Sequence, residues 1–291
     1  MREIQLIELY CAVCHHYRTT LVAHAQRSSN NFCPKFSDEE VITTLIWGIY
    51  NQKYDVKRCY EFVVDYYGEW FPRLPSYKVY IKRLNFLDDA IKALASTLLS
   101  GLGLEGGHAD FIYDSMPIVV AGSTRSNRAS VANELCNKGY CAAKDMWYYG
   151  VKLHILAQCN HKAMPTPTLV QISKASEHDR KIAEQLLDGV NNIRVFADLA
   201  LLDKRWQADM LEQNNVEILT PVKRSKGQEV LSSADKFFSR AISSTKQAIE
   251  SLNNWLIEKT GIQRASKVRS SKGLSVFLFA RVACACFCFK W

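Results

Sequence analysis

The chain has 291 residues, of which 48% are hydrophobic and 23% are charged. This length allows one large domain or two modest ones with a sizeable core. The composition is that of a globular protein and argues against a disordered chain.

The excess of positive charge, +8 for the whole chain, lies mostly near the C-terminus. Residues 219–273 contain eleven Lys and Arg against four Asp and Glu, a net charge of +7. Such a segment suits a polyanionic partner, because each neutralised phosphate releases a condensed counterion. A solvated basic surface explains the same charge equally well, so both interpretations stay open at this point.

The first hundred residues predict helices. Ser37 and Glu40 have the spacing of a capping box, and Val41, Leu45 and Ile49 follow at helical spacing. Ser76 is expected to cap a later helix that is rich in aromatic and basic residues. That helix fits either a DNA-recognition helix or, more simply, a helix of a bundle with a solvated face. Its residues include Tyr77, Lys78, Tyr80, Lys82 and Arg83, with an apolar stripe of Leu84, Leu87 and Ile91.

Ten cysteines are present, but their spacing predicts no metal framework. Cys11 and Cys14 precede two histidines, yet no second ligand pair follows. No signal peptide is evident, so we expect free thiols in a reducing cytoplasm. The apolar run Leu274–Phe289 contains Arg281 and is shorter than the roughly twenty residues of a bilayer span. We therefore expect a packed terminal helix and no membrane.

The pattern changes after the glycines at 101, 103, 106 and 107. Short apolar runs with β-forming residues then predict strands, and helical patterns follow between them. This order indicates a mixed α/β domain of residues 106–291 after a helical domain of residues 1–105. The expected strands are 111–113, 118–120, 148–159, 168–172, 192–197 and 217–222, and the expected helices are 179–187, 204–213 and 242–258.

Three carboxylates stand out in this second part. Asp114 and Asp198 each follow an apolar strand, and Glu250 lies on a predicted helix. Carboxylate oxygens are the ligands that Mg²⁺ prefers, and two such ions can activate the attacking oxygen and stabilise the leaving one at phosphorus. Aspartate also commonly follows strands for structural reasons, because it caps helices and starts turns. Spacing alone therefore favours the structural role for either aspartate.

Several segments in order resemble the motifs of bacterial insertion-sequence DDE transposases. The resemblance runs from about residue 36 to the C-terminus. Each segment alone is weakly specific, whereas the ordered set is strong. The segments are Asp114-Ser115-Met116-Pro117, Tyr148-Tyr149-Gly150-Val151-Lys152-Leu153-His154, Phe196-Ala197-Asp198, Thr220-Pro221-Val222-Lys223, the stretch Ile249 to Leu256, and the stretch Ile262 to Ser270.

This resemblance implies an RNase H-like catalytic domain, with a mixed five-stranded sheet flanked by helices. It implies that Asp114, Asp198 and Glu250 hold two Mg²⁺ (or Mn²⁺) ions, with Asp114 bridging both. It also implies hydrolytic cleavage of the element's terminal inverted repeats, followed by attack of the freed 3′-hydroxyls on target DNA. Double-stranded DNA is then the partner, a homo-oligomer forms on it, and the protein works at the nucleoid.

Basic residues near these motifs are candidates for DNA contacts. Lys152 and His154 share one face of their strand and are candidates for phosphate contact, although a solvent-facing edge explains them as well. Lys246 lies one helical turn before Glu250, where it can balance the carboxylate or bind phosphate. His178-Asp179 is expected to cap a helix, with a supporting role at the carboxylates as the alternative. The basic cluster expected to contact the DNA backbone is Arg264, Lys267, Arg269 and Lys272.

Two departures from the family pattern bear on activity. Leu199-Ala200-Leu201 follows Asp198, where the family commonly has a basic residue, a small one and a tyrosine. Lys246 stands where arginine is more usual. Two alternatives to a complete transposase therefore stay open: an RNase H-like nuclease or resolvase without a joining step, and an inactive DNA-binding remnant.

Overall fold

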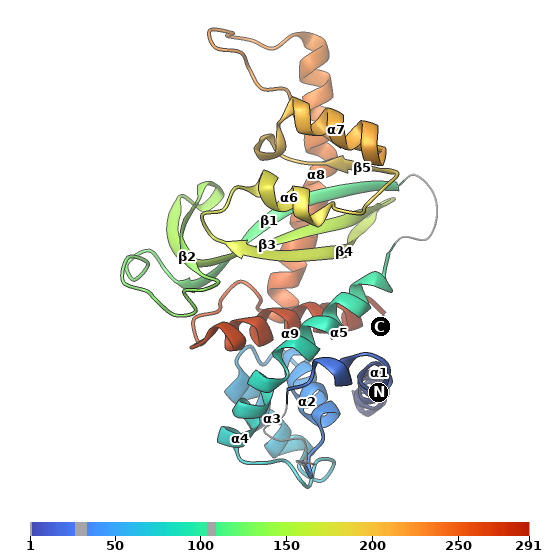
Figure 1. Ribbon diagram of the computed structural model, residues 1–291, viewed down its shortest axis with the longest axis vertical. Coiled ribbons are helices and arrows are strands. Elements are labelled where there is room, and N and C mark those ends of the chain that lie inside the picture. The colour runs from blue at the N-terminus through green and yellow to red at the C-terminus, as the bar shows by residue number, and fades with distance from the viewer. Residues whose placement is uncertain (1, 27–33, 104–108, 291) are drawn as a thin grey trace. The chain divides into compact units, whose positions relative to one another are not determined.

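The computed structural model describes residues 2–26, 34–103 and 109–290 (Figure 1). The chain packs into two compact units. The first consists of residues 1–99, 129–134 and 256–291, and the second of residues 100–128 and 135–255. The expected boundary between residues 105 and 106, with its glycines at 106 and 107, lies outside the described residues and stays a prediction.

The second unit is built on one mixed sheet, with six strands among the described residues. The order is β2-β3-β1-β5-β6, and β4 pairs with the remaining length of β3. The expected mixed α/β fold with flanking helices is confirmed, and β2 is a strand that the sequence pattern did not predict. The strands are β1 (Ala109–Ala121), β2 (Asn137–Cys141), β3 (Met146–Asn160), β4 (Ala163–Lys174), β5 (Ile193–Phe196) and β6 (Val216–Leu219).

β1 is one continuous strand, whereas the sequence predicted two runs separated by Asp114 to Pro117. It pairs antiparallel with β3 from Phe111 onward and parallel with β5 only from Ala109 to Ile112. Beyond Ile112 no described strand pairs with β1 on the β5 side. Proline lacks an N–H and is tolerated at such an open edge, which explains how Pro117 fits inside the strand.

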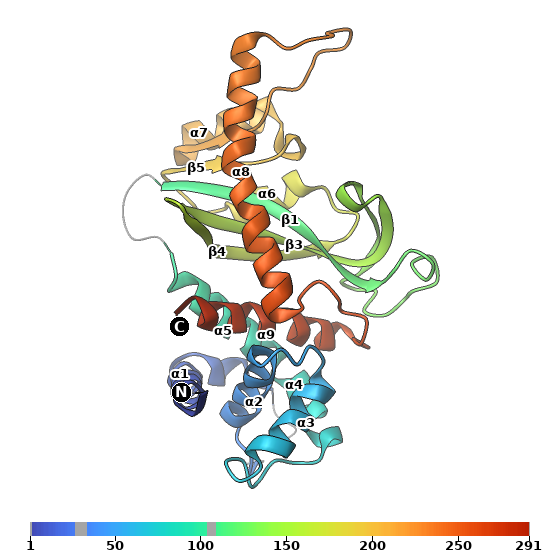
Figure 2. The same ribbon diagram turned by 180° about the vertical axis from the view of Figure 1, so that it is seen from behind.

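Helices cover both faces of this sheet. α6 (Asp179–Leu186) lies on one face, and α8 (Ser233–Thr260) crosses the opposite face, as Figures 1 and 2 together show. α8 begins nine residues before the predicted helix 242–258. On the α6 side, α7 (Lys204–Asn214) and the short helix η3 (Leu199–Leu201) complete the cover. The core there contains Phe111, Val195, Leu201, Trp206 and Ile218.

The first unit is helical, as expected. Its helix α2 (Asp38–Tyr50) begins with the predicted capping box between Ser37 and Glu40. The helix expected after Ser76 is two helices that meet at Leu87. Tyr80, Arg83 and Leu84 of the first of these are buried, so this face packs inside the unit. The two helices that meet at Leu87 are α4 (Tyr77–Phe86) and α5 (Asp88–Ser100). The unit also contains α1 (Arg2–Thr19), η1 (Leu21–His24), α3 (Val56–Tyr67) and α9 (Ser271–Lys290).

α9 is the helix expected from the apolar C-terminal run. By length and composition, residues 271–289 are sufficient to cross a membrane, but 78% of the apolar window is buried within the structure. Arg281 is itself buried, and its guanidinium donates to the backbone oxygens of Phe277 and Tyr54. Burial of the apolar side chains confirms the prediction of a packed terminal helix.

The close approach of β1 and β3 depends on Gly150. A Cβ atom at this position would lie 2.0 Å from the backbone oxygen of Ile118. We expect Gly150→Ala to lower the free energy of unfolding by at least about 2 kcal/mol, because the strands must separate. Urea denaturation measures this change. Gly122→Ala is the matched control, since its Cβ meets nothing within 4 Å and is expected to change stability by less than about 0.5 kcal/mol. Equal effects of the two changes would contradict the explanation.

Candidate active site

Asp114, Asp198 and Glu250 all line one cavity of about 1040 Å³ in the second unit, here called the carboxylate cavity. They come from β1, from the residue that follows Ala197 after β5, and from α8. The open edge of β1 explains why the cavity reaches residues on both faces of the sheet. Its other walls include Ser115, Pro117, Tyr140, Cys141, Tyr148, Lys152, Asp179, Arg240, Ser243 and Gln247.

Asp114 is held by two side chains of α8. Asn253 donates from Nδ2 to Asp114 Oδ2 at 2.9 Å, and Lys246 Nζ lies 3.8 Å from Asp114 Oδ1. Burial raises the pKa of Asp114 above its ordinary value, the Lys246 ammonium opposes that rise, and the Asp198 carboxylate adds to it. Asp114 therefore retains a proton more readily than an exposed aspartate does.

Lys246 connects the two aspartates. Its Nζ lies 2.5 Å from Asp198 Oδ1 as well as 3.8 Å from Asp114 Oδ1, and only 11% of its side chain is exposed. Glu250 is exposed and lines the same cavity, but it forms no hydrogen bond or ion pair with either aspartate in the described part of the chain. No group of three His, Cys, Asp or Glu among the described residues is spaced to hold one metal ion. The structure thus brings the aspartates together around an ammonium and leaves Glu250 on the cavity wall.

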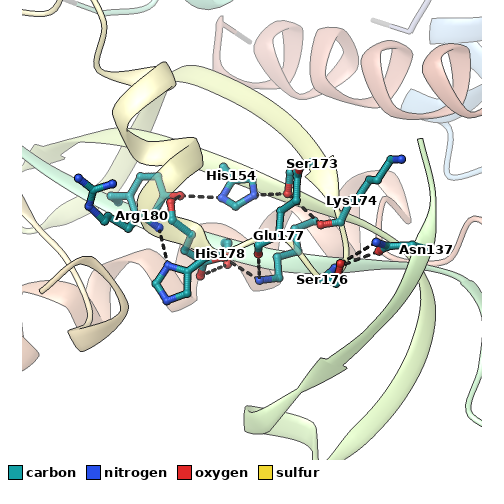
Figure 3. Close-up of polar contacts among 12 residues, drawn as sticks. Asn137, His154, Ser173, Lys174, Ser176, Glu177, His178 and Arg180 are labelled. Atoms are coloured by element: carbon teal, nitrogen blue, oxygen red, sulfur yellow. Dashed lines mark hydrogen bonds and ion pairs between the residues drawn. The ribbon is translucent and has the colours of Figure 1, made fainter. Parts of the chain in front are cut away.

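A second polar cluster lines the cavity on the α6 side. Lys152 Nζ lies 2.8 Å from Asp179 Oδ1 and donates to the backbone oxygen of Glu177, and Ser115 donates to Asp179 Oδ2 at 2.9 Å. His178 is the residue that caps α6, because its Nδ1 accepts from the Arg180 N–H (Figure 3). The cap expected of His178-Asp179 is therefore present at His178, whereas Asp179 pairs with Ser115 and Lys152 and its supporting role at the carboxylates stays a prediction.

His154 lies on the same strand face as Lys152 but is fully buried. A hydrogen bond of 2.6 Å joins its Nδ1 to the Tyr113 hydroxyl. Another of 2.8 Å joins its Nε2 to the Ser173 hydroxyl (Figure 3). Both ring nitrogens are occupied inside the protein, so this geometry does not offer His154 to DNA. Its position indicates support for the strand that carries Asp114.

The predicted basic cluster lies in the first unit, on the segment after α8 and on the first turn of α9. Arg264, Lys267, Arg269 and Lys272 are all exposed. Arg269 donates to the backbone oxygens of Ser266 and Val268, and Lys272 donates to Gln26. None of the four lines the carboxylate cavity. Their contact with the DNA backbone stays a prediction.

The departure after Asp198 has a structural explanation. Leu199–Leu201 form the short helix η3, in which the Leu201 N–H donates to the backbone oxygen of Asp198. Leu201 is 1% exposed and belongs to the hydrophobic core, whereas Leu199 is exposed. An apolar side chain at 201 therefore stabilises the turn that presents Asp198.

Several residues of this site were not predicted from the sequence. Asn253 follows Glu250 by three positions, a spacing that places both on one side of α8, and this was the available signal. Ser115 and Arg240 gave no separate signal, because their position depends on the path of β1 and the early start of α8. Tyr140 was missed with strand β2, which carries it.

A mixed α/β unit in which an aspartate inside β1, an aspartate after β5 and a glutamate on α8 line one cavity defines a class of candidate phosphoryl-transfer domains. Residues 107–270, more than half of the chain, match the Transposase DDE domain family. The chain therefore belongs to this family, so it is a transposase, DNA is its partner, and divalent metals are the ions that the family generally uses. Comparison with curated proteins finds no match.

The buried histidine makes stability depend on pH. Burial lowers the pKa of His154 from 6.5 to about 4, with the Asp179 carboxylate opposing this change. Between these values the unfolded chain binds more protons than the folded one, so acid favours unfolding. The stability that neutral His154 contributes is fully present above pH 6.5 and is lost as the pH falls towards 4. We expect His154 to cost about 2 kcal/mol of stability between pH 7 and pH 5.

Urea denaturation of the wild type and His154→Gln at pH 7 and pH 5 measures this change in the free energy of unfolding. The variant is less stable at pH 7 but should lose less stability on acidification. His161→Gln is the matched control, since His161 is exposed and should leave the pH dependence as in the wild type. The prediction would be contradicted if His154→Gln lost as much free energy of unfolding between pH 7 and pH 5 as the wild type does.

Proposed function

We propose that this transposase cleaves the ends of its element and joins the freed 3′-hydroxyls to target DNA at the carboxylate cavity. The observation that carries the proposal is the convergence of Asp114, Asp198 and Glu250 on one cavity. Each comes from a different element of the family's domain, so the fold alone brings them to a common space.

The donor chemistry of the cavity fits divalent metal ions. The carboxylates supply hard oxygen ligands, and the Asn253 Oδ1 atom beside Asp114 is buried without a hydrogen-bond partner among the described residues. The Lys246 ammonium between Asp114 and Asp198 indicates that positive charge is stabilised there. We assign Asp114, Asp198 and Glu250 as ligands of two Mg²⁺ (or Mn²⁺) ions. When bound, such ions activate the attacking oxygen and stabilise the leaving oxygen at phosphorus.

The remaining residues of the cavity orient the metal-binding carboxylates and the DNA substrate. Asn253 fixes one oxygen of Asp114, and the Lys152–Asp179–Ser115 cluster fixes the strand next to it. Lys152 and Arg240 supply positive charge for the DNA phosphates, which bind such side chains through charge-assisted hydrogen bonds. The joining step exchanges one phosphodiester for another, so no covalent link between protein and DNA is required.

Other parts of the proposal concern the complex. The exposed cluster Arg264, Lys267, Arg269 and Lys272 binds the DNA backbone, the helices of residues 1–105 bind the element's terminal repeats, and two or more subunits assemble on the DNA. Residues 106–291 then act as the catalytic domain. These assignments follow the charge distribution and the family's need to hold two DNA ends and a target.

Asp114→Asn is expected to reduce Mg²⁺-dependent nicking of DNA that carries the element's ends by at least about a hundredfold, because a metal ligand is lost. Gel analysis of end-labelled DNA measures the nicks. Asp110→Asn is the matched control on the same strand, since Asp110 is exposed and does not line the cavity. Unchanged nicking by Asp114→Asn would refute the assigned ligand.

The products separate the remaining alternatives. Nicked ends covalently joined to a target plasmid support the transposase, and cleavage without joining supports a nuclease or resolvase. Binding of the ends without any metal-dependent cleavage by the wild type supports an inactive remnant.

Lys246 is expected to compete with metal ions for the two aspartates. Lys246→Met should bind Mn²⁺ about three- to tenfold more tightly in the absence of DNA, because no ammonium must be displaced. Isothermal titration calorimetry measures this affinity. Lys236→Met is the matched control on the same helix, since Lys236 is exposed and does not line the cavity. Weaker Mn²⁺ binding by Lys246→Met would contradict the competition.

A further inference from the structure

The hairpin of β2 and β3 presents two large aromatic side chains at the rim of the carboxylate cavity. Tyr140 and Trp147 are directly opposite each other in the β2–β3 register, with ring centroids 5.2 Å apart. Tyr140 is 45% exposed and Trp147 is 51% exposed. Tyr140 also lines the cavity, together with the next three residues of the chain. We call Tyr140 and Trp147 the aromatic pair.

The hairpin that carries the aromatic pair is anchored to the turn between β4 and α6. Asn137 donates to the Ser176 hydroxyl, and its Oδ1 accepts from the Ser176 N–H (Figure 3). Gly139 allows close approach at the next contact, since a Cβ atom there would lie 2.5 Å from the backbone oxygen of Ala175. The Tyr140 hydroxyl donates to Asp145 within the hairpin. These contacts hold the rings in place, so little ordering is required when a ligand binds.

A cation accompanies the rings. Lys138 Nζ lies 4.5 Å from the centroid of the Trp147 ring and donates to Asn127 Oδ1 at 2.6 Å. The side chains of Lys138 and Tyr140 share one face of β2, because residues two apart in a strand point the same way. An indole, a phenol and an ammonium on one surface provide a stacking face and a charge for phosphate, which together match a nucleotide.

Stabilisation of the hairpin accounts for only part of this arrangement. A cross-strand aromatic pair contributes up to about 1 kcal/mol to a hairpin. That contribution does not require both rings to be half exposed at the edge of the cavity that holds Asp114, Asp198 and Glu250. Tyrosine and tryptophan in such positions provide large, rigid contact surfaces for a partner.

We propose that the aromatic pair binds an unpaired nucleobase of the DNA strand whose phosphates enter the carboxylate cavity. The base stacks on the exposed face of the pair, and Lys138 contacts a neighbouring phosphate. Paired bases within a duplex have both faces covered, so the site selects a base that has left the stack. The inference deepens the proposed function, because it places the reacting strand in the same cavity.

The test compares two single-stranded oligonucleotides of equal length and charge, oligo(dT) and its abasic counterpart, by fluorescence anisotropy in EDTA. The full-length wild type should bind oligo(dT) at least about fivefold more tightly than the abasic strand, since stacking adds to phosphate binding. Trp147→Ala should abolish that preference while keeping its affinity for the abasic strand. Lys138→Ala should weaken the binding of both strands by a similar factor.

Trp70→Ala is the matched control, because Trp70 is 46% exposed and belongs to the other compact unit. It should keep the preference for oligo(dT), as should Trp147→Phe, which retains an aromatic ring and covers the case in which the alanine variant does not fold. The proposal is overturned if Trp147→Ala keeps the wild-type preference, if the wild type has none, or if Trp147→Phe loses it like a non-aromatic variant. Because EDTA prevents metal-dependent cleavage, Asp114→Asn should also retain the preference, so the result is independent of the catalytic assignment.

Discussion

β1 pairs with β3 along most of its thirteen residues, but with β5 over only its first four. This difference in length leaves the edge of β1 open from Tyr113 onward. A carboxylate at Asp114 is thereby fixed by an ordered strand and still reaches a cavity. Asp198 follows where β5 ends, so the same geometry brings both aspartates to one edge. The candidate active site depends on this short parallel pairing.

Three of the carboxylates that line the cavity are paired with lysines of the protein. Lys246 lies between Asp114 and Asp198, and Lys152 pairs with Asp179 on the other side of the sheet. Removing carboxylates from water is costly unless cations or hydrogen bonds compensate them. Divalent cations and the Lys246 ammonium are then alternative partners for the same two aspartates. The hydrogen bonds Tyr113–His154–Ser173 link β1, β3 and β4, and all three side chains are buried.

The β2–β3 hairpin extends the site beyond the carboxylates. Its anchoring through Asn137 and Gly139 is independent of the acidic residues, and its aromatic pair faces solvent at the cavity rim. Chemistry at phosphorus and recognition of a displaced base would then be served by different elements of one unit. The exposed basic cluster of Arg264, Lys267, Arg269 and Lys272 belongs to the other unit and supplies charge without chemistry of its own.

Local patterns in the sequence predicted much of the fold, because apolar periodicity and caps act within a few residues. The capping box at Ser37, the buried terminal helix and the strand before Asp198 are examples, whereas the local pattern broke β1 into two runs at Asp114 to Pro117. Long-range packing decided the rest. It buried His154, which alternation alone placed beside Lys152 on an accessible face, and it set Lys246 between two aspartates 132 and 48 positions away. Strand β2 formed because β3 offered an edge to it, a neighbour that no local pattern encodes.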